Sequence, residues 1–160
     1  MRSWLPNDLD PRALACVTAA LDDVGEMETP AGSNRGPYVD ALNAAAGSPL
    51  GSFWCATAAT KWRRQGGASI PPHDAGSCEA WRKWAFETGR FGSHPDYGAV
   101  ALYGESPTHA SHCGLVVRLG PVCDVEANTS LAGYSRNGEV VTLKAVDTVR
   151  LIGFVHIDPT

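Results

Sequence analysis

The chain lacks an excess of basic residues, and it lacks long apolar runs. Its 160 residues carry a net charge of −4. Nucleic-acid binders and polybasic membrane binders need a cationic surface, so we expect neither kind of partner. Residues 1–8 contain no apolar core of signal-peptide length, and no segment reaches the roughly 18 apolar residues of a membrane span. We therefore expect no membrane insertion and a protein made in the cytoplasm, which reaches other compartments only through other factors.

Paired-cysteine motifs, internal repeats and low-complexity linkers are also absent. Five cysteines form an odd set with no C-x-x-C spacing, which predicts a reduced protein with at least one free thiol under any pairing scheme. Hydrophobic residues make up 44% of the chain and charged residues 19%, as in a globular domain with a substantial core. We expect one domain over residues 1–160, without a separate accessory domain, and a monomer. The five cysteines are Cys16, Cys55, Cys78, Cys113 and Cys123.

Helical patterns dominate the first half of the sequence. Asp10 followed by Pro11 is typical of a helix start, and Ser52 and Ser77 can each cap a later helix. Apolar residues then recur at helical spacing until glycines end the runs. We predict four helices, at residues 10–25, 37–47, 52–67 and 77–89.

Short runs rich in β-branched residues follow Gly92, separated by Gly, Pro, Asn and Ser clusters. Asn137-Gly138 predicts a turn before the fourth of these runs. Helices first and strands afterwards indicate an α+β domain, with an antiparallel C-terminal sheet packed on N-terminal helices. We predict strands at residues 99–103, 112–119, 122–128, 139–146 and 149–157.

Cys55 lies in the first turn of the third predicted helix. A thiol there is close to the partial positive charge of unpaired backbone N–H groups, which lowers its pKa and favours the nucleophilic thiolate. The alternative is ordinary packing, because Trp54 and alanines surround it and free cysteines are usually buried.

A predicted hairpin supplies candidate partners for this thiol. Its two strands, joined near Gly120-Pro121, bring His112 close to Glu126 and Asn128, which share one face of the second strand. His112 shares that face only if the numbers of two residues paired across the strands add to an even number, as they do when His112 lies opposite Asn128. A two-residue turn would place the histidine on the other side, so we expect a longer connection.

These residue types together suit nucleophilic catalysis. Cys55 would be the nucleophile and His112 the group that takes and returns the proton. Glu126 or Asn128 would orient the imidazole, and the sequence does not decide between them. The backbone N–H of Cys55, unpaired at the helix start, is the expected oxyanion donor.

Five short motifs follow one another along the chain. They are Asn34-Arg35-Gly36-Pro37 with Val39-Asp40, Trp54-Cys55-Ala56, Cys78-Glu79-Ala80-Trp81, His112-Cys113-Gly114-Leu115-Val116 and Glu126-Ala127-Asn128-Thr129. In this order they resemble the motifs of CHAP domains, the cysteine, histidine-dependent amidohydrolases and peptidases of peptidoglycan hydrolysis. The resemblance covers about residues 20–157 and implies a papain-like fold, related to NlpC/P60 enzymes, with the nucleophile at a helix N-terminus. It also implies an active site of Cys55, His112, Glu126 and Asn128.

The resemblance implies a peptidoglycan hydrolase similar to phage endolysins, which cleaves a peptide or amide bond after release to the cell wall. Which wall bond is cut stays open. The alternatives are an injected antibacterial toxin, an amidase acting on a small conjugate, and an idle wall-binding module. We expect no cofactor and no metal. Some relatives bind calcium through an aspartate cluster, whereas Asp40 stands alone in the equivalent stretch.

Several other residues have two readings. A zinc site of His109, His112, Cys113 and Cys123 lacks the usual ligand spacing, and neighbours on a strand point to opposite faces. Trp54 is a candidate for lining the cleft. Asn34 is either a turn residue, which the surrounding Gly and Pro favour, or a cleft residue. Arg35 is either an ion-pair partner or a contact for substrate carboxylates. We expect Trp62, Trp81 and Trp84 in the core, because their spacing is helical.

Overall fold

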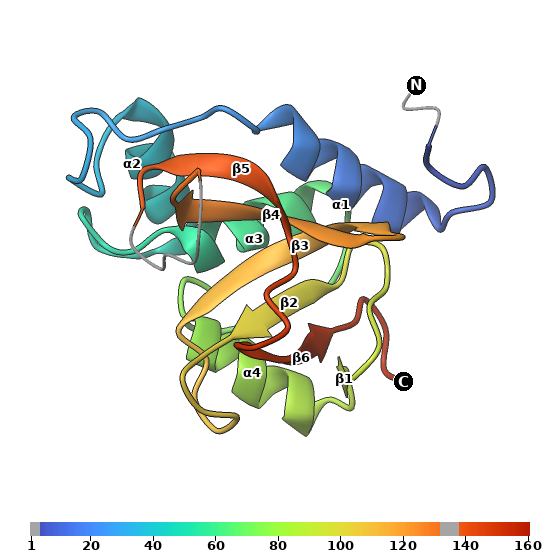
Figure 1. The fold of residues 1–160 in the computed structure, drawn as a ribbon. Coiled ribbons are helices and arrows are strands. Elements are labelled where there is room, and N and C mark those ends of the chain that lie inside the picture. The colour runs from blue at the N-terminus through green and yellow to red at the C-terminus, as the bar shows by residue number, and fades with distance from the viewer. Residues whose placement is uncertain (1–3, 132–137) are drawn as a thin grey trace.

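The structure is a computed structural model that describes residues 4–131 and 138–160. Within these residues it contains four helices and a six-stranded antiparallel sheet, which confirms the α+β prediction (Figure 1). The helices are α1 (Pro11–Asp22), α2 (Pro37–Ala46), α3 (Cys55–Gln65) and α4 (Cys78–Glu87). The strands are β1 (Phe91–Gly92), β2 (Val100–Tyr103), β3 (His112–Leu119), β4 (Val122–Thr129), β5 (Val140–Ala145) and β6 (Leu151–Val155).

The helix starts follow the capping signals of the sequence, with one exception. Asp10 accepts a hydrogen bond from the Arg12 backbone N–H at the start of α1, and Ser77 accepts one from that of Ala80 at the start of α4. Ser52, however, does not cap α3. That helix begins at Cys55 with Trp54 as its N-cap residue and no side-chain capping bond. Cys55 is therefore the first residue of α3.

The wrong prediction for Ser52 has a local cause. The backbone N–H of Ser52 closes a turn on the carbonyl of Pro49, at 3.2 Å, so Ser52 belongs to the turn that precedes the helix. The first backbone bond of α3 runs from the N–H of Ala58 to the carbonyl of Trp54, at 3.1 Å. This shift of the N-cap by two residues, from Ser52 to Trp54, places the Cys55 side chain closer to the helix end than the sequence predicted.

The sheet has the strand order β1-β6-β2-β3-β4-β5. Strand β1 was not predicted, because its two residues are too few to show a period. The other five strands lie where they were expected. The predicted turn at Asn137-Gly138 lies partly outside the described residues.

The β3–β4 hairpin carries the predicted His112 face. The pairs Gly114 with Glu126 and Val116 with Asp124 both have the even sum that the prediction required. Only two residues, Gly120 and Pro121, separate β3 from β4, so the longer connection was a wrong prediction. An irregularity between Val116 and Arg118 shifts the register by one residue and restores the even sum near the site.

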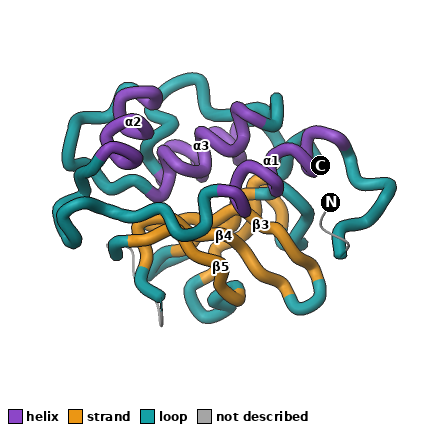
Figure 2. Tube along the Cα trace, turned by 90° about the horizontal axis from the view of Figure 1, so that it is seen from above, coloured by secondary structure: helices purple, strands orange, loops and turns teal. Residues whose placement is uncertain are grey.

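The helices and the sheet form two layers. Helices α1, α2 and α3 lie together over one face of the sheet (Figure 2), and α4 contacts β1 and β6. The main core fills the space between the layers and includes Trp54, Trp62 and Trp81, each without exposed surface. None of the helices in the described part of the chain has both the length and the apolar character that a membrane crossing requires.

Candidate active site

Cys55 is placed by α3 against the ends of two other elements. Its side chain is 4% exposed, and its Sγ lies 3.5 Å from that of Cys78, the first residue of α4. Cys113 of β3 completes a cluster whose three sulfurs lie within 4.8 Å of one another. The nucleophile candidate is thus buried among other thiols and lies at the junction of α3, α4 and β3.

His112 is held by Glu126. The His112 Nε2 and a Glu126 carboxylate oxygen, Oε2, are 2.8 Å apart, and both side chains are almost fully buried. The hydroxyl of Thr129 donates to the same Oε2 at 2.9 Å, and the Lys144 ammonium lies 3.5 Å away. Two further donors therefore fix the carboxylate that orients the imidazole.

The thiol and the imidazole affect each other's ionisation. Hydrogen bonds from Cys113 and Cys78, and then the interaction with His112, lower the pKa of Cys55 well below its usual value against the raising effect of burial. Burial by itself would lower the pKa of His112, but its interactions with Cys55 and Glu126 prevail and raise that pKa to about 10. The lowered pKa of Cys55 and the raised pKa of His112 both favour a thiolate beside an imidazolium at neutral pH.

Asn128 lies near this pair without bonding to it. Its backbone has a φ of 54°, in the left-handed region that asparagine tolerates better than most residues. Its side-chain amide is buried and makes no hydrogen bond with any described residue. Of the two orienting groups that the sequence left open, Glu126 is the one that contacts the ring.

Gly114 explains why the residue two positions after His112 must be small. A Cβ added there would lie 2.2 Å from Oδ2 of Asp124 and 3.0 Å from Cγ of Glu126. No rigid carboxylate can accept such a contact. The glycine therefore lets β4 bring its two acidic side chains alongside β3.

Asp124 is a site residue that the sequence analysis missed. It is fully buried, and the Tyr103 hydroxyl donates to its Oδ2 at 2.6 Å. Burial, followed by the nearby charge of Glu126, raises the pKa of Asp124 to about 7. The available signal was its position two residues before Glu126 on the same strand face.

The three residues suggested for substrate binding do not gather at the thiol. Trp54 has no exposed surface, and its indole N–H donates to Glu28 at 2.8 Å, so it lines no cleft here. Arg35 forms a two-bond ion pair with Asp40, at 2.8 and 3.0 Å. Asn34 has a φ of 52°, in agreement with its turn reading. For Trp54 the position next to the nucleophile misled the prediction, because the ring turns into the core.

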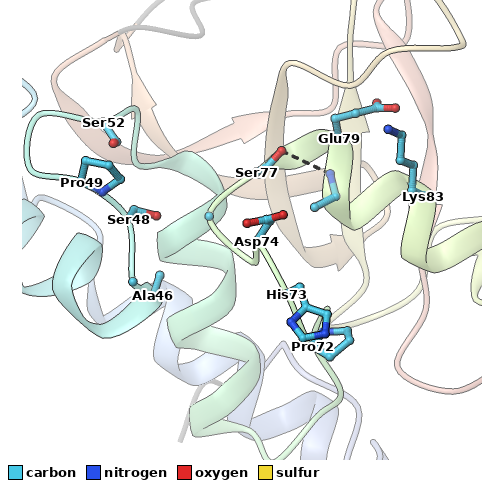
Figure 3. A pocket seen from close by; sticks show the side chains of 13 residues that line it. Ala46, Ser48, Pro49, Ser52, Pro72, His73, Asp74, Ser77, Glu79 and Lys83 are labelled. Carbon is cyan, nitrogen blue, oxygen red and sulfur yellow. Dashed lines mark hydrogen bonds between the residues drawn. The ribbon is translucent and has the colours of Figure 1, made fainter.

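A pocket of about 670 Å³ lies beside the site (Figure 3). It is lined by the segment before α3, including Ser52, and by the start of α4, including Ser77 and Glu79. These last two residues flank Cys78. Cys55 and His112 themselves are not among the lining residues, so the reactive groups lie behind the pocket wall.

The metal-ligating groups gather differently from the zinc alternative considered on the sequence. His109 is exposed and faces Glu79 at 3.8 Å, away from the buried Cys113. The side chains that come together are Cys55, Cys78 and Cys113, three cysteines on three different elements. No sequence spacing signals such a set, because its members lie 23 and 35 residues apart along the chain.

Comparison of the chain with family models, with curated proteins and with solved structures gives no match.

Proposed function

We propose that this protein is a cysteine-dependent hydrolase that cleaves an amide or peptide bond of bacterial peptidoglycan. The observation that carries the proposal is the buried His112–Glu126 pair beside a thiol whose pKa is lowered at the start of α3. An activated thiol, a base and a group that orients the base are the parts that covalent acyl transfer needs.

Each residue would have one role in the reaction. The Cys55 thiolate attacks the carbonyl carbon, and the resulting oxyanion accepts a hydrogen bond from the Cys55 backbone N–H. The His112 imidazolium then gives its proton to the departing amine as the C–N bond breaks, which leaves a thioester on Cys55. Neutral His112 takes a proton from water, and the resulting hydroxide attacks the thioester carbonyl. The C–S bond then breaks, which releases the acid and restores the Cys55 thiolate beside the His112 imidazolium. Glu126 keeps the ring oriented throughout.

The substrate class rests on the sequence motifs. Trp54-Cys55-Ala56, His112-Cys113-Gly114 and Glu126-Ala127-Asn128-Thr129 resemble CHAP domains, and the α+β arrangement is compatible with their papain-like fold. We accordingly propose a monomeric, endolysin-like enzyme without a cofactor, made in the cytoplasm and acting on the wall after release.

Wall hydrolysis tests the proposal. Purified peptidoglycan is incubated with the wild type, with Cys55→Ala and with Cys123→Ala, whose thiol lies outside the three-cysteine cluster. We expect the turbidity to fall with the wild type and Cys123→Ala but not with Cys55→Ala. Mass spectrometry of the fragments would then identify the bond. Equal clearing by wild type and Cys55→Ala would refute the cysteine mechanism.

The burial of the thiol favours a second candidate, an idle wall-binding module of the same fold. Cys55 is only 4% exposed and lies outside the neighbouring pocket, so no substrate carbonyl reaches it without movement of the wall that contains Ser52 or Ser77. This candidate predicts that wild type and Cys55→Ala sediment equally with peptidoglycan and that neither releases fragments.

A further inference from the structure

The three-cysteine cluster of Cys55, Cys78 and Cys113 has the dimensions of a metal site. The sulfurs lie within 4.8 Å of one another, and those of Cys55 and Cys78 are 3.5 Å apart. Zinc–sulfur bonds of about 2.3 Å in a tetrahedral site put two sulfurs roughly 3.8 Å apart. No sulfur pair therefore needs to move by more than about 1 Å for one ion to reach all three sulfurs.

The three ligands come from well-supported positions. Cys55 and Cys78 are the first residues of α3 and α4, and Cys113 is the second residue of β3. Helices α3 and α4 contact each other, and α3 packs on β3. Three buried thiols of this kind suit a soft or borderline cation far better than magnesium or calcium.

We propose that Cys55, Cys78 and Cys113 bind one Zn²⁺ ion through their three sulfurs, with a water molecule as the fourth ligand. This site shares Cys55 with the proposed catalytic site, but the binding of the ion does not depend on the proposed hydrolysis. It has one consequence that does rest on the proposed function. A sulfur that shares an electron pair with Zn²⁺ is a much weaker nucleophile toward a carbonyl, so we expect the zinc-loaded protein to be the inactive form.

The pocket beside the site lies next to one of the three ligands. Ser77 and Glu79, which flank Cys78, both line it, and Cys78 is the most exposed of the three cysteines at 7% (Figure 3). Asp74 and Glu79 place carboxylates on this wall, where Glu79 is paired with Arg82 and Lys83 adds a positive charge. The ion would therefore meet Cys78 first and Cys113, at 1% exposure, last.

Cobalt spectroscopy tests the binding site without any measurement of activity. The reduced, metal-free protein is titrated with Co²⁺, and the intensity of the near-ultraviolet sulfur-to-cobalt band gives the number of sulfur ligands per ion. We expect saturation at one ion per chain with three sulfurs. Cys55→Ser, Cys78→Ser and Cys113→Ser should each lower the intensity by about a third. Cys16→Ser and Cys123→Ser are the matched controls and should leave it unchanged.

Three results would contradict the proposed site. One is the absence of a charge-transfer band at saturating Co²⁺. The other is an intensity loss in Cys123→Ser or Cys16→Ser equal to that in Cys113→Ser, which would indicate thiols that bind independently. Competition by Zn²⁺ should abolish the band, and failure of excess Zn²⁺ to do so would also contradict the assignment.

The inhibitory consequence is measured separately. If the wild type clears peptidoglycan, Zn²⁺ should stop the reaction at the same midpoint at which it displaces Co²⁺, and EDTA should restore it. Zinc binding without wall hydrolysis would refute the proposed function and leave the metal site intact. Hydrolysis that continues in the zinc-saturated protein would refute the inhibitory consequence.

Discussion

The orientation of His112 depends on the carboxylate of Glu126. It accepts bonds from the imidazole and from Thr129, and it lies near the Lys144 ammonium. Its fixed position explains why the ring keeps one orientation in the buried site. Asn128, which the sequence offered as the alternative, makes no such contact.

Single substitutions of Glu126 and Asn128 distinguish their roles. In Glu126→Gln the imidazolium loses its charged partner, so we expect kcat for wall hydrolysis to fall by about tenfold or more, with a lower pKa of His112. Asn128→Ala should leave the pKa of His112 close to that of the wild type, whatever its effect on the rate. A larger drop in the His112 pKa in Asn128→Ala than in Glu126→Gln would contradict this assignment.

Gly114 makes the second prediction at this scale. The added methyl group of Gly114→Ala would press on Asp124 and Glu126, and we expect a loss of about 1–3 kcal/mol in the free energy of unfolding. Gly120→Ala is the control, because a Cβ there meets nothing within 4 Å. Denaturant unfolding of both variants checks this, and an equal loss in the two would show that contact with the acidic pair is not the cause.

Helices α3 and α4 both deliver a cysteine to the cluster, but their starts differ. Ser77 caps α4 through its hydroxyl, whereas α3 has no side-chain cap and begins directly with the nucleophile candidate. The first N–H groups of α3 are consequently left without a side-chain acceptor at its start, as an oxyanion site requires.

Serine-to-alanine variants measure this difference. Ser77→Ala should cost about 1 kcal/mol of unfolding free energy, because the N–H of Ala80 loses its acceptor. Ser52→Ala should cost much less, since Ser52 contributes only backbone groups to its turn. Thermal or denaturant unfolding provides the comparison, and a cost at Ser52 as large as that at Ser77 would mean that Ser52 does cap α3.

Strand β4 carries two carboxyl groups, Asp124 and Glu126, whose pKa values shift in opposite directions. The pKa of Asp124 is raised to about 7, so between about pH 4 and pH 7 the folded state keeps a proton that the unfolded chain releases. Stability due to this group is therefore lost as the pH rises through that window. Asp124→Asn removes the titration, and its unfolding free energy relative to the wild type should increase by up to a few kcal/mol from pH 4 to pH 7. A difference that stays constant over this range would refute the account.

At the scale of the whole molecule, the fold could be predicted further than the site. Periodicity gave α1 to α4 and five strands. The face shared by His112 and Glu126 was predicted for the wrong reason, because it depends on the irregularity after Val116 and not on a longer connection. The irregularity after Val116 could not be predicted, because it depends on how the hairpin fits the sheet and not on any residue pattern.

The contacts between the helices and the sheet could not be predicted from the sequence for the same reason. The approach of Cys78 and Cys113 to Cys55 depends on the packing of α4 and β3 against α3, and nothing in the local sequence encodes it. The burial of Trp54 was also missed, since a tryptophan next to a nucleophile fits a cleft and a core equally well. Local chemistry was readable from the sequence, whereas the surroundings of each group required the fold.

The ion pair between Cys55 and His112 is the central claim, and the protonation of His112 tests it most directly. Nitrogen NMR of the imidazole at pH 8, in a metal-free and reduced sample, distinguishes the imidazolium from the neutral ring. We expect the wild type to hold both ring protons at pH 8, in line with a pKa of about 10, and Cys55→Ala to titrate at lower pH. A neutral His112 ring in the wild type at pH 8, or an unchanged titration in Cys55→Ala, would contradict the thiolate–imidazolium pair.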